Sequence, residues 1–131
     1  TEPERAAEVA QIARDFHWFQ TLTTERDVIL AVDFNYPPTS PKMGPFRNLP
    51  DTVNLIPAGT LTTLKASGQG FSSWYDHLYV NGQATTEATG KEGAYDFAAG
   101  LGYTDTQQAR SEITDHLPVW AEFGVDQPDD D

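Results

Sequence analysis

A polar triplet that runs directly into an alternating apolar segment limits the folds open to this chain more than any other feature. The segment at residues 113–123 reads ITDHLPVWAEF, and its apolar side chains recur at every second position from 117 to 123. This period predicts a strand with one buried face. Asp115 and His116 stand where that strand begins, so both can face a cleft at the edge of a sheet. A carboxylate beside an imidazole suits metal-assisted proton transfer, although an isolated pair is more simply a strand-capping Asp next to an exposed His.

Two further segments change that interpretation because they also place acidic residues at or near strand ends. The segment at 27–38 reads DVILAVDFNYPP, so an apolar run ends in Asp33 and a proline loop follows. The segment at 72–82 reads SSWYDHLYVNG, in which Asp76 stands within an alternating strand pattern. An Asp is disfavoured in a strand unless another group compensates it. Three such residues, with Asn or His residues close by, predict a common site.

Taken in order, these segments resemble the endonuclease/exonuclease/phosphatase superfamily, and within it the deoxyribonuclease I-like enzymes. VDFN at 32–35 resembles the family's GDFN strand end, WYDHLYVNG at 74–82 its YDR-type strand, and ITDHLPV at 113–119 its SDHYPV signature. The segments at 54–63 and 94–119 follow the same pattern, so the resemblance covers residues 27 to 123. It implies an α/β (α+β) fold with a leading helix and mixed, mostly antiparallel sheet, which forms the C-terminal half of a four-layer α/β sandwich. Phosphatases and sphingomyelinases of the superfamily share these signatures.

The resemblance also implies a role for each matching residue. Asp33 positions or deprotonates the attacking water and contributes to the metal site, and Asn35 hydrogen-bonds the scissile phosphate. Asp76 orients the catalytic His116, and Asp115 is a metal ligand. The set is coherent for phosphodiester hydrolysis, which needs an activated water, neutralisation of charge on oxygen and a fixed imidazole. Oxygen ligands in a chain without cysteine favour Mg²⁺, with Mn²⁺ or Ca²⁺ as alternatives.

Two positions depart from the family pattern. Val32 replaces the Gly that precedes the Asp in the family, where a side chain could crowd neighbouring backbone. His77 follows Asp76 where deoxyribonucleases carry Arg. We place His77 with Asn35 as a phosphate-binding residue, and the alternative is an outward strand residue that touches no substrate.

The charge balance is unusual for a protein that acts on nucleic acid. Twenty Asp and Glu residues against eight Lys and Arg give a formal net charge of −12, and no basic patch is evident. One hypothesis is adaptation to high salt, which screens self-repulsion, and the alternative is an ordinary acidic protein. No apolar run reaches the roughly 18 residues of a membrane span. The acidic composition and extracellular relatives in the superfamily favour an extracellular location.

The remaining pattern predicts one helix followed mainly by strands. We expect a helix over residues 2–19 and strands over 27–34, 60–64, 74–80 and 117–123. A proline-rich loop is expected over 36–50 and a Gly-Ser loop over 66–73. A short strand or loop is expected over 85–97, and a polar connection leads from there to the last strand. His17, Trp18 and Phe19 are expected to pack the end of the helix. Residues 1–123 are assigned to one domain, and the acidic tail at 124–131 is expected to be disordered.

By this resemblance the chain holds only part of an active site, since the family's N-terminal half supplies an Asn and a metal-binding Glu. Three interpretations follow. In the first, the chain is part of a metal-dependent nuclease that acts on nucleic acid, with DNA favoured. In the second, it is a non-catalytic acidic binding or assembly module. In the third, it is part of a phosphatase or lipid phosphodiesterase. Exposed sheet faces favour either pairing with the missing half or self-association.

Overall fold

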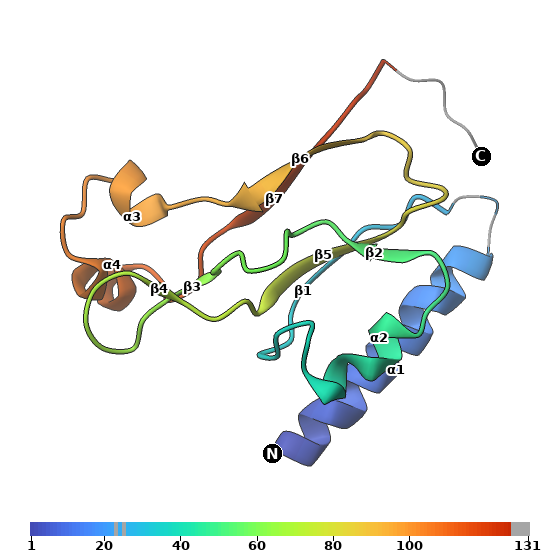
Figure 1. Cartoon of the computed structure of the whole chain (residues 1–131), viewed down its shortest axis with the longest axis horizontal. Coiled ribbons are helices and arrows are strands. Elements are labelled where there is room, and N and C mark those ends of the chain that lie inside the picture. The colour runs from blue at the N-terminus through green and yellow to red at the C-terminus, as the bar shows by residue number, and fades with distance from the viewer. Residues whose placement is uncertain (23, 25, 127–131) are drawn as a thin grey trace.

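The protein is described here from a computed structural model, which covers residues 1–22, 24 and 26–126. Its elements in chain order are α1 (Glu2–Leu22), β1 (Leu30–Asp33), η1 (Pro41–Met43), α2 (Gly44–Arg47), β2 (Thr52–Asn54), β3 (Thr63–Leu64), β4 (Phe71–Ser72), β5 (Asp76–Asn81), β6 (Ala88–Ala94), α3 (Phe97–Gly100), α4 (Thr106–Glu112) and β7 (Val119–Phe123). Helices α1 and α2 lie together at one end, α3 and α4 lie at the other, and the strands run between them (Figure 1). The fold is mixed α/β with antiparallel sheets and a leading helix, as expected.

A three-stranded antiparallel sheet in the order β1-β5-β2 forms the centre of the fold. In its register, Asp33 at the end of β1 lies opposite Asp76 at the start of β5. Side chains alternate between the two faces of a strand, so Asp76 and His77 project to opposite sides of the sheet. One face of the sheet therefore carries the two carboxylates, while His77 and Tyr79 face the other side.

Helix α1 and the short helices after β1 cover the face that carries Tyr79. The buried cluster there consists of Val9, Ala13, Phe16, Phe34, Met43, Phe46 and Tyr79. The helical residues of this cluster recur at three- and four-residue spacing, which places them on one stripe of α1. Glu2 and Glu4 lie in the first turn of α1, where the helix dipole favours negative charge. Packing against α1 thereby fixes the strand that ends in Asp33.

The opposite end of the molecule has its own buried cluster, formed by Leu64, Phe97, Ala98, Ala109 and Leu117. Helices α3 and α4 begin at N-caps, where the side chains of Asp96 and Asp105 accept hydrogen bonds from backbone N–H groups. The pairs β3–β4 and β6–β7 are two-stranded and antiparallel. Because Leu117 belongs to this cluster, it anchors the segment that leads from α4 through His116 into β7.

Several expected elements differ in extent or kind from the structure. Helix α1 extends to Leu22, beyond the expected residue 19, and β1 begins only at Leu30. The polar connection before the last strand contains α3 and α4, and the Gly-Ser loop contains β4. Residues 88–94 form a strand of seven residues. The acidic tail from 127 on lies outside the described residues.

The expectation for the end of α1 was wrong. Trp18 and Phe19 are about half exposed, at 54% and 53%, and His17 is exposed as well. The buried stripe of α1 runs through Val9, Ala13, Phe16 and Gln20, and positions 17 to 19 point away from it. None of the helices in the described part of the chain combines the length and apolar character needed to cross a membrane.

Candidate active site

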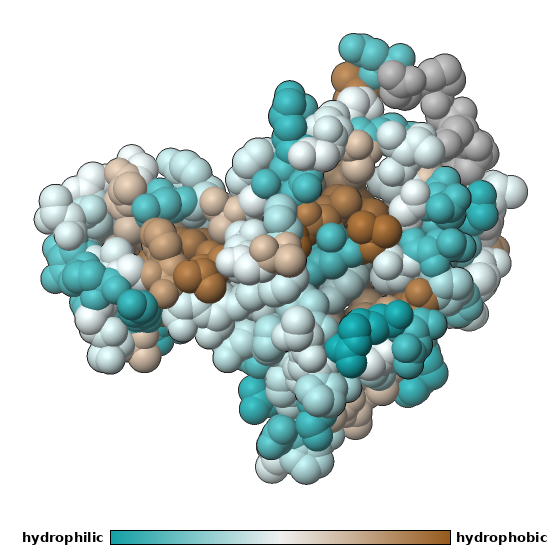
Figure 2. Space-filling model, viewed as in Figure 1, coloured by the Kyte–Doolittle hydropathy of each residue, from teal (hydrophilic) through white to brown (hydrophobic). Residues whose placement is uncertain are grey.

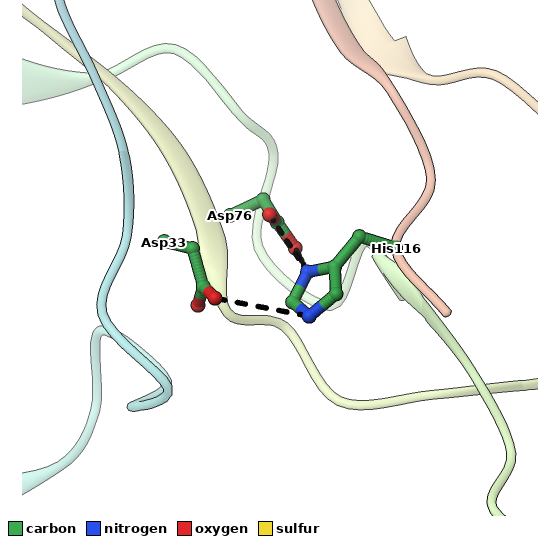
Figure 3. Close-up of side chains that lie close together, drawn as sticks. All are labelled: Asp33, Asp76 and His116. Carbon is green, nitrogen blue, oxygen red and sulfur yellow. Dashed lines mark hydrogen bonds and ion pairs between the residues drawn. The ribbon is translucent and has the colours of Figure 1, made fainter. Parts of the chain in front are cut away.

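Three side chains from distant parts of the sequence meet at one end of the central sheet. Asp33 comes from the end of β1, Asp76 from the start of β5 and His116 from the segment before β7 (Figure 3). The Nδ1 atom of His116 lies 3.0 Å from each carboxylate oxygen of Asp76. On the other side of the ring, Nε2 lies 3.7 Å from Oδ2 of Asp33. The imidazole therefore stands between two carboxylates, with a hydrogen bond to one and a wider gap to the other.

Backbone pairing sets the position of His116. Thr63 and His116 form an isolated antiparallel bridge, and the N–H of Leu117 donates to the carbonyl of Thr62 over 2.7 Å. The N–H of Leu64 donates to the carbonyl of Asp115 over 2.8 Å. The segment at 115–117 is thus bonded to residues 62–64 along its length, which aims the imidazole at the start of β5.

A buried threonine, Thr62, holds Asp76. Its hydroxyl donates to Oδ2 of Asp76 over 2.6 Å, and its oxygen accepts the backbone N–H groups of Tyr75 and Asp76 at 3.0 and 3.2 Å. The residue is fully buried, at 0% exposure. Asp76 is therefore fixed by a hydroxyl on one side and an imidazole on the other. We did not single out Thr62 from the sequence, although it lies within the segment NLIPAGTLTT that carries part of the resemblance.

Asn35 closes the opposite side of the site in an uncommon backbone conformation. Its φ is +53°, a left-handed value that Asn tolerates better than most residues. Its backbone N–H donates to Oδ1 of Asp33 over 2.8 Å, and its side-chain amide donates to Oδ2 over 3.2 Å. The turn after β1 therefore holds Asn35 and Asp33 together.

The two carboxylates act on the titration of His116. Burial alone lowers the pKa of His116, but the hydrogen bond to Asp76 and the charges of Asp76, Asp33 and Asp115 outweigh it. The net effect raises the pKa of His116 above its ordinary value. The imidazolium form is therefore more populated near neutral pH than it would be for an isolated histidine.

A polar pocket of about 190 Å³ opens beside the imidazole. His116, Asn35, Arg110 and Asp115 are among the residues that line it. Nη2 of Arg110 lies 2.9 Å from Oδ2 of Asp115. The structure places Asp115 in this ion pair and not in the group formed by Asp33, Asp76 and His116. Arg110 was missed in the sequence, where its only signal is a cation six residues before His116.

His77 does not occupy the place expected of a phosphate ligand. The side chain is fully buried, at 0% exposure, and Nε2 lies 3.1 Å from the carbonyl oxygen of Tyr36. Nδ1 lies 3.1 Å from the amide nitrogen of Asn54. A carbonyl accepts and an amide N–H₂ donates, so the pair of contacts fits a neutral ring with its proton on Nε2. Both ring nitrogens are thereby engaged by the protein, and the alternative of an outward strand residue is wrong as well.

The site residues fit a hard cation in part. Asp33, Asp76 and His116 each bring a ligand atom within 4.8 Å of the others. The carboxylate of Asp76 is already used by Thr62 and His116, and its side chain is only 15% exposed, compared with 34% for Asp33. Asp33 also accepts hydrogen bonds, from Asn35, but it is the more exposed carboxylate and is thus better placed to bind an ion. One carboxylate with water or substrate in the other positions is an arrangement that Mg²⁺ accepts.

Comparison with known proteins does not identify a relative. No protein-family model matches the chain, and no curated protein matches it. The interpretation of the site therefore depends on its residues and their geometry.

Proposed function

We propose that this chain provides part of the active site of a metal-dependent phosphodiesterase, a nuclease of the deoxyribonuclease I-like type. The observation that carries the proposal is the convergence of Asp33, Asn35, Asp76 and His116 from three separate segments of the chain, with Asn35 and His116 also lining a polar pocket. These are the residues through which the sequence resembles that family. The four-layer sandwich, of which this chain would form the C-terminal half, is part of the same proposal.

The geometry suits both donation of a proton by His116 and acceptance of a proton by Asp33. Asp76 accepts a hydrogen bond from Nδ1 of His116 and so leaves Nε2 facing the site. A protonated Nε2 can donate to the oxygen that leaves phosphorus, while Asp33 accepts the proton of the attacking water. The 3.7 Å between Nε2 and Asp33 is longer than a hydrogen bond, so the ring is not bound directly to that carboxylate.

A divalent cation would supply charge neutralisation on the phosphate oxygens and a lowered pKa of a bound water. Asp33 would hold it, and Mg²⁺ is the proposed ion, with Mn²⁺ or Ca²⁺ as alternatives. The side-chain amide of Asn35 donates a hydrogen bond to Asp33, and Asn35 also lines the pocket. In the proposed site the same amide donates to a phosphate oxygen. DNA is the proposed substrate, and an extracellular location is proposed with it.

The remaining groups of the site are proposed to come from a second polypeptide segment or a second copy of this chain. Exposed hydrophobic surface supports this part of the proposal. Val53 on β2 and Trp120 on β7 are 44% and 45% exposed. Figure 2 shows hydrophobic residues gathered between the β6–β7 pair and β2. A partner that covered this surface would remove apolar area from water.

Nicking of supercoiled plasmid in Mg²⁺, at low and high salt, tests the function. If a second copy of the chain completes the site, we expect the purified chain to relax the plasmid, and His116→Ala and Asp33→Asn to abolish the activity. His17→Ala is the matched control, because it removes an exposed imidazole on α1 far along the sequence from the site residues. Nicking that persists in His116→Ala would come from a contaminant, and a folded chain that never nicks would be inactive by itself.

A further inference from the structure

The pocket beside His116 carries chemistry that the hydrolytic step does not use. Besides His116 and Asn35, its walls include Ser72, Ser73 and Arg110. Hydroxyl groups and a guanidinium are donors to phosphate oxygens. The pocket measures about 190 Å³, below the roughly 300 to 1,000 Å³ of pockets that enclose drug-sized ligands. It therefore suits a small anionic group such as a phosphate, and not a lipid or a whole nucleotide.

Arg110 is held in place before any ligand arrives. Its Nη1 donates to the carbonyl oxygen of Leu64 over 2.9 Å, and its Nη2 lies 2.9 Å from Asp115. The side chain is 29% exposed, so the guanidinium is neither loose in solvent nor fully buried. These contacts use two of the five N–H donors of a guanidinium, and such a group binds phosphate through a planar fork.

The charge of the whole chain makes this cation important. With a net charge of −12, the protein repels a polyanion, and a favourable contact must come from local positive charge. Arg110 is the cationic residue that lines this pocket. Asp115 balances its charge, so a phosphate that enters the pocket competes with that carboxylate for the guanidinium.

We propose that this pocket binds the phosphate that flanks the scissile phosphodiester and that Arg110 recognises it. The substrate is then an oligonucleotide with at least two phosphates, and not a lone phosphomonoester or a lipid phosphodiester. This inference rests on the proposed function, which defines the phosphodiester that is cleaved. The binding that it predicts is measured without hydrolysis.

The test compares a dinucleoside monophosphate, thymidylyl-thymidine, with the same compound carrying an added 5′ or 3′ terminal phosphate. Binding is titrated by nuclear magnetic resonance at low salt in a chelator, so that no turnover occurs. We expect one of the two phosphorylated forms to bind about tenfold more tightly than the unphosphorylated one, as a charge-assisted contact provides. Whichever form binds tighter reports the polarity of the bound strand.

Arg110→Gln should abolish this preference, because the added phosphate then loses the guanidinium and still faces the carboxylate of Asp115. Arg14→Gln is the matched control: it makes the same change on the exposed surface of α1 and should keep the full preference. Arg110→Lys retains the charge without the fork and should keep part of it. If loss of the Leu64 contact unfolds Arg110→Gln, Arg110→Lys and Asp115→Asn carry the test, and Asp115→Asn should increase the preference.

The outcomes separate this inference from the proposed function. Equal binding of all three compounds by the wild-type chain would overturn the subsite, even if plasmid nicking depended on His116. A preference that survives Arg110→Gln would also overturn it. A tenfold preference lost in Arg110→Gln, in a chain that never cleaves DNA, would support the subsite and count against catalysis by this chain alone.

Discussion

Asp33 and Asp76 lie directly opposite each other on neighbouring strands, with both carboxylates on the same face of the sheet. Like charges in this arrangement destabilise a sheet. His116 reaches both carboxylates from a different part of the chain, so its positive form offsets their repulsion. The site thus couples the protonation of one histidine to the pairing of β1 with β5.

Stability should depend on the protonation of His116. The pKa of His116 is raised in the folded chain, so the protonated form contributes stability that is fully present below the ordinary pKa near 6.5. This contribution is lost as the pH rises through the raised pKa. We expect the wild-type chain to lose more thermal stability than His116→Gln between about pH 6 and pH 9. Parallel melting curves against pH for the two proteins would contradict the coupling.

Loss of the Thr62 hydroxyl should weaken both the fold and the site. Thr62→Val keeps the shape of the side chain but leaves Asp76 with only the hydrogen bond from His116 among those described, and it removes the acceptor of two backbone N–H groups. We expect a loss of about 1 to 3 kcal/mol in the free energy of unfolding, measured by urea denaturation, and lower nicking activity.

The control for this change is Thr85→Val. Thr85 is also buried, at 8% exposure, but its hydroxyl has no hydrogen-bond partner among the described residues. Removing it should leave stability unchanged or raise it, because no bond is broken and a buried polar atom disappears. An equal loss in both variants would mean that the Thr62 hydrogen bonds contribute nothing specific.

His77 should behave as a structural residue and not as a ligand of the substrate. His77→Phe leaves the carbonyl of Tyr36 and the amide of Asn54 unpaired, so we expect a loss of about 1 to 3 kcal/mol in the free energy of unfolding. Burial lowers the pKa of His77, which means that wild-type stability falls as the pH drops below the ordinary pKa, and the variant should lose this dependence. A variant with unchanged stability and weaker binding of thymidylyl-thymidine would restore the phosphate-binding role.

The meeting of Asp33, Asp76 and His116 could be predicted because each residue stands in or beside a strand pattern and matches a motif of the family that the chain resembles. The buried stripe of α1 could also be predicted, from the spacing of its apolar residues. The prediction for residues 17 to 19 failed because those positions lie off the stripe. Helices α3 and α4 had a local signal that we did not use, namely the N-cap residues Asp96 and Asp105.

Other features depend on tertiary contacts that no local pattern encodes. Thr62 became a partner of Asp76 only because residues 62–64 lie between the two segments of the site. Alternation alone places His77 on the face opposite Asp76, but it does not tell which face is filled by α1 and α2. The position of Asp115 depends on its ion pair with Arg110 on α4, which the motif around His116 does not reveal.

Asp115→Asn distinguishes the two roles considered for Asp115. If Asp115 pairs mainly with Arg110, the variant frees the guanidinium and should bind the phosphorylated dinucleotide more tightly than the wild type does. If it is a metal ligand, as the resemblance implies, the variant should need a higher Mg²⁺ concentration for nicking. A Mg²⁺ titration of nicking tests the role as a metal ligand, and the metal-free binding measurement tests the pairing with Arg110. An unchanged result in both assays would contradict each of them.

Salt should stabilise the folded chain. The net charge of −12 creates self-repulsion in the folded state, and the screening length falls from about 10 Å at 0.1 M salt to about 3 Å at 1 M. We therefore expect the melting temperature to rise between low and molar sodium chloride. The same experiment with sucrose is the control, because sucrose strengthens burial without screening charge. A larger rise per unit of osmolality in salt than in sucrose would support adaptation to high salt, and a flat response to salt would leave an ordinary acidic protein.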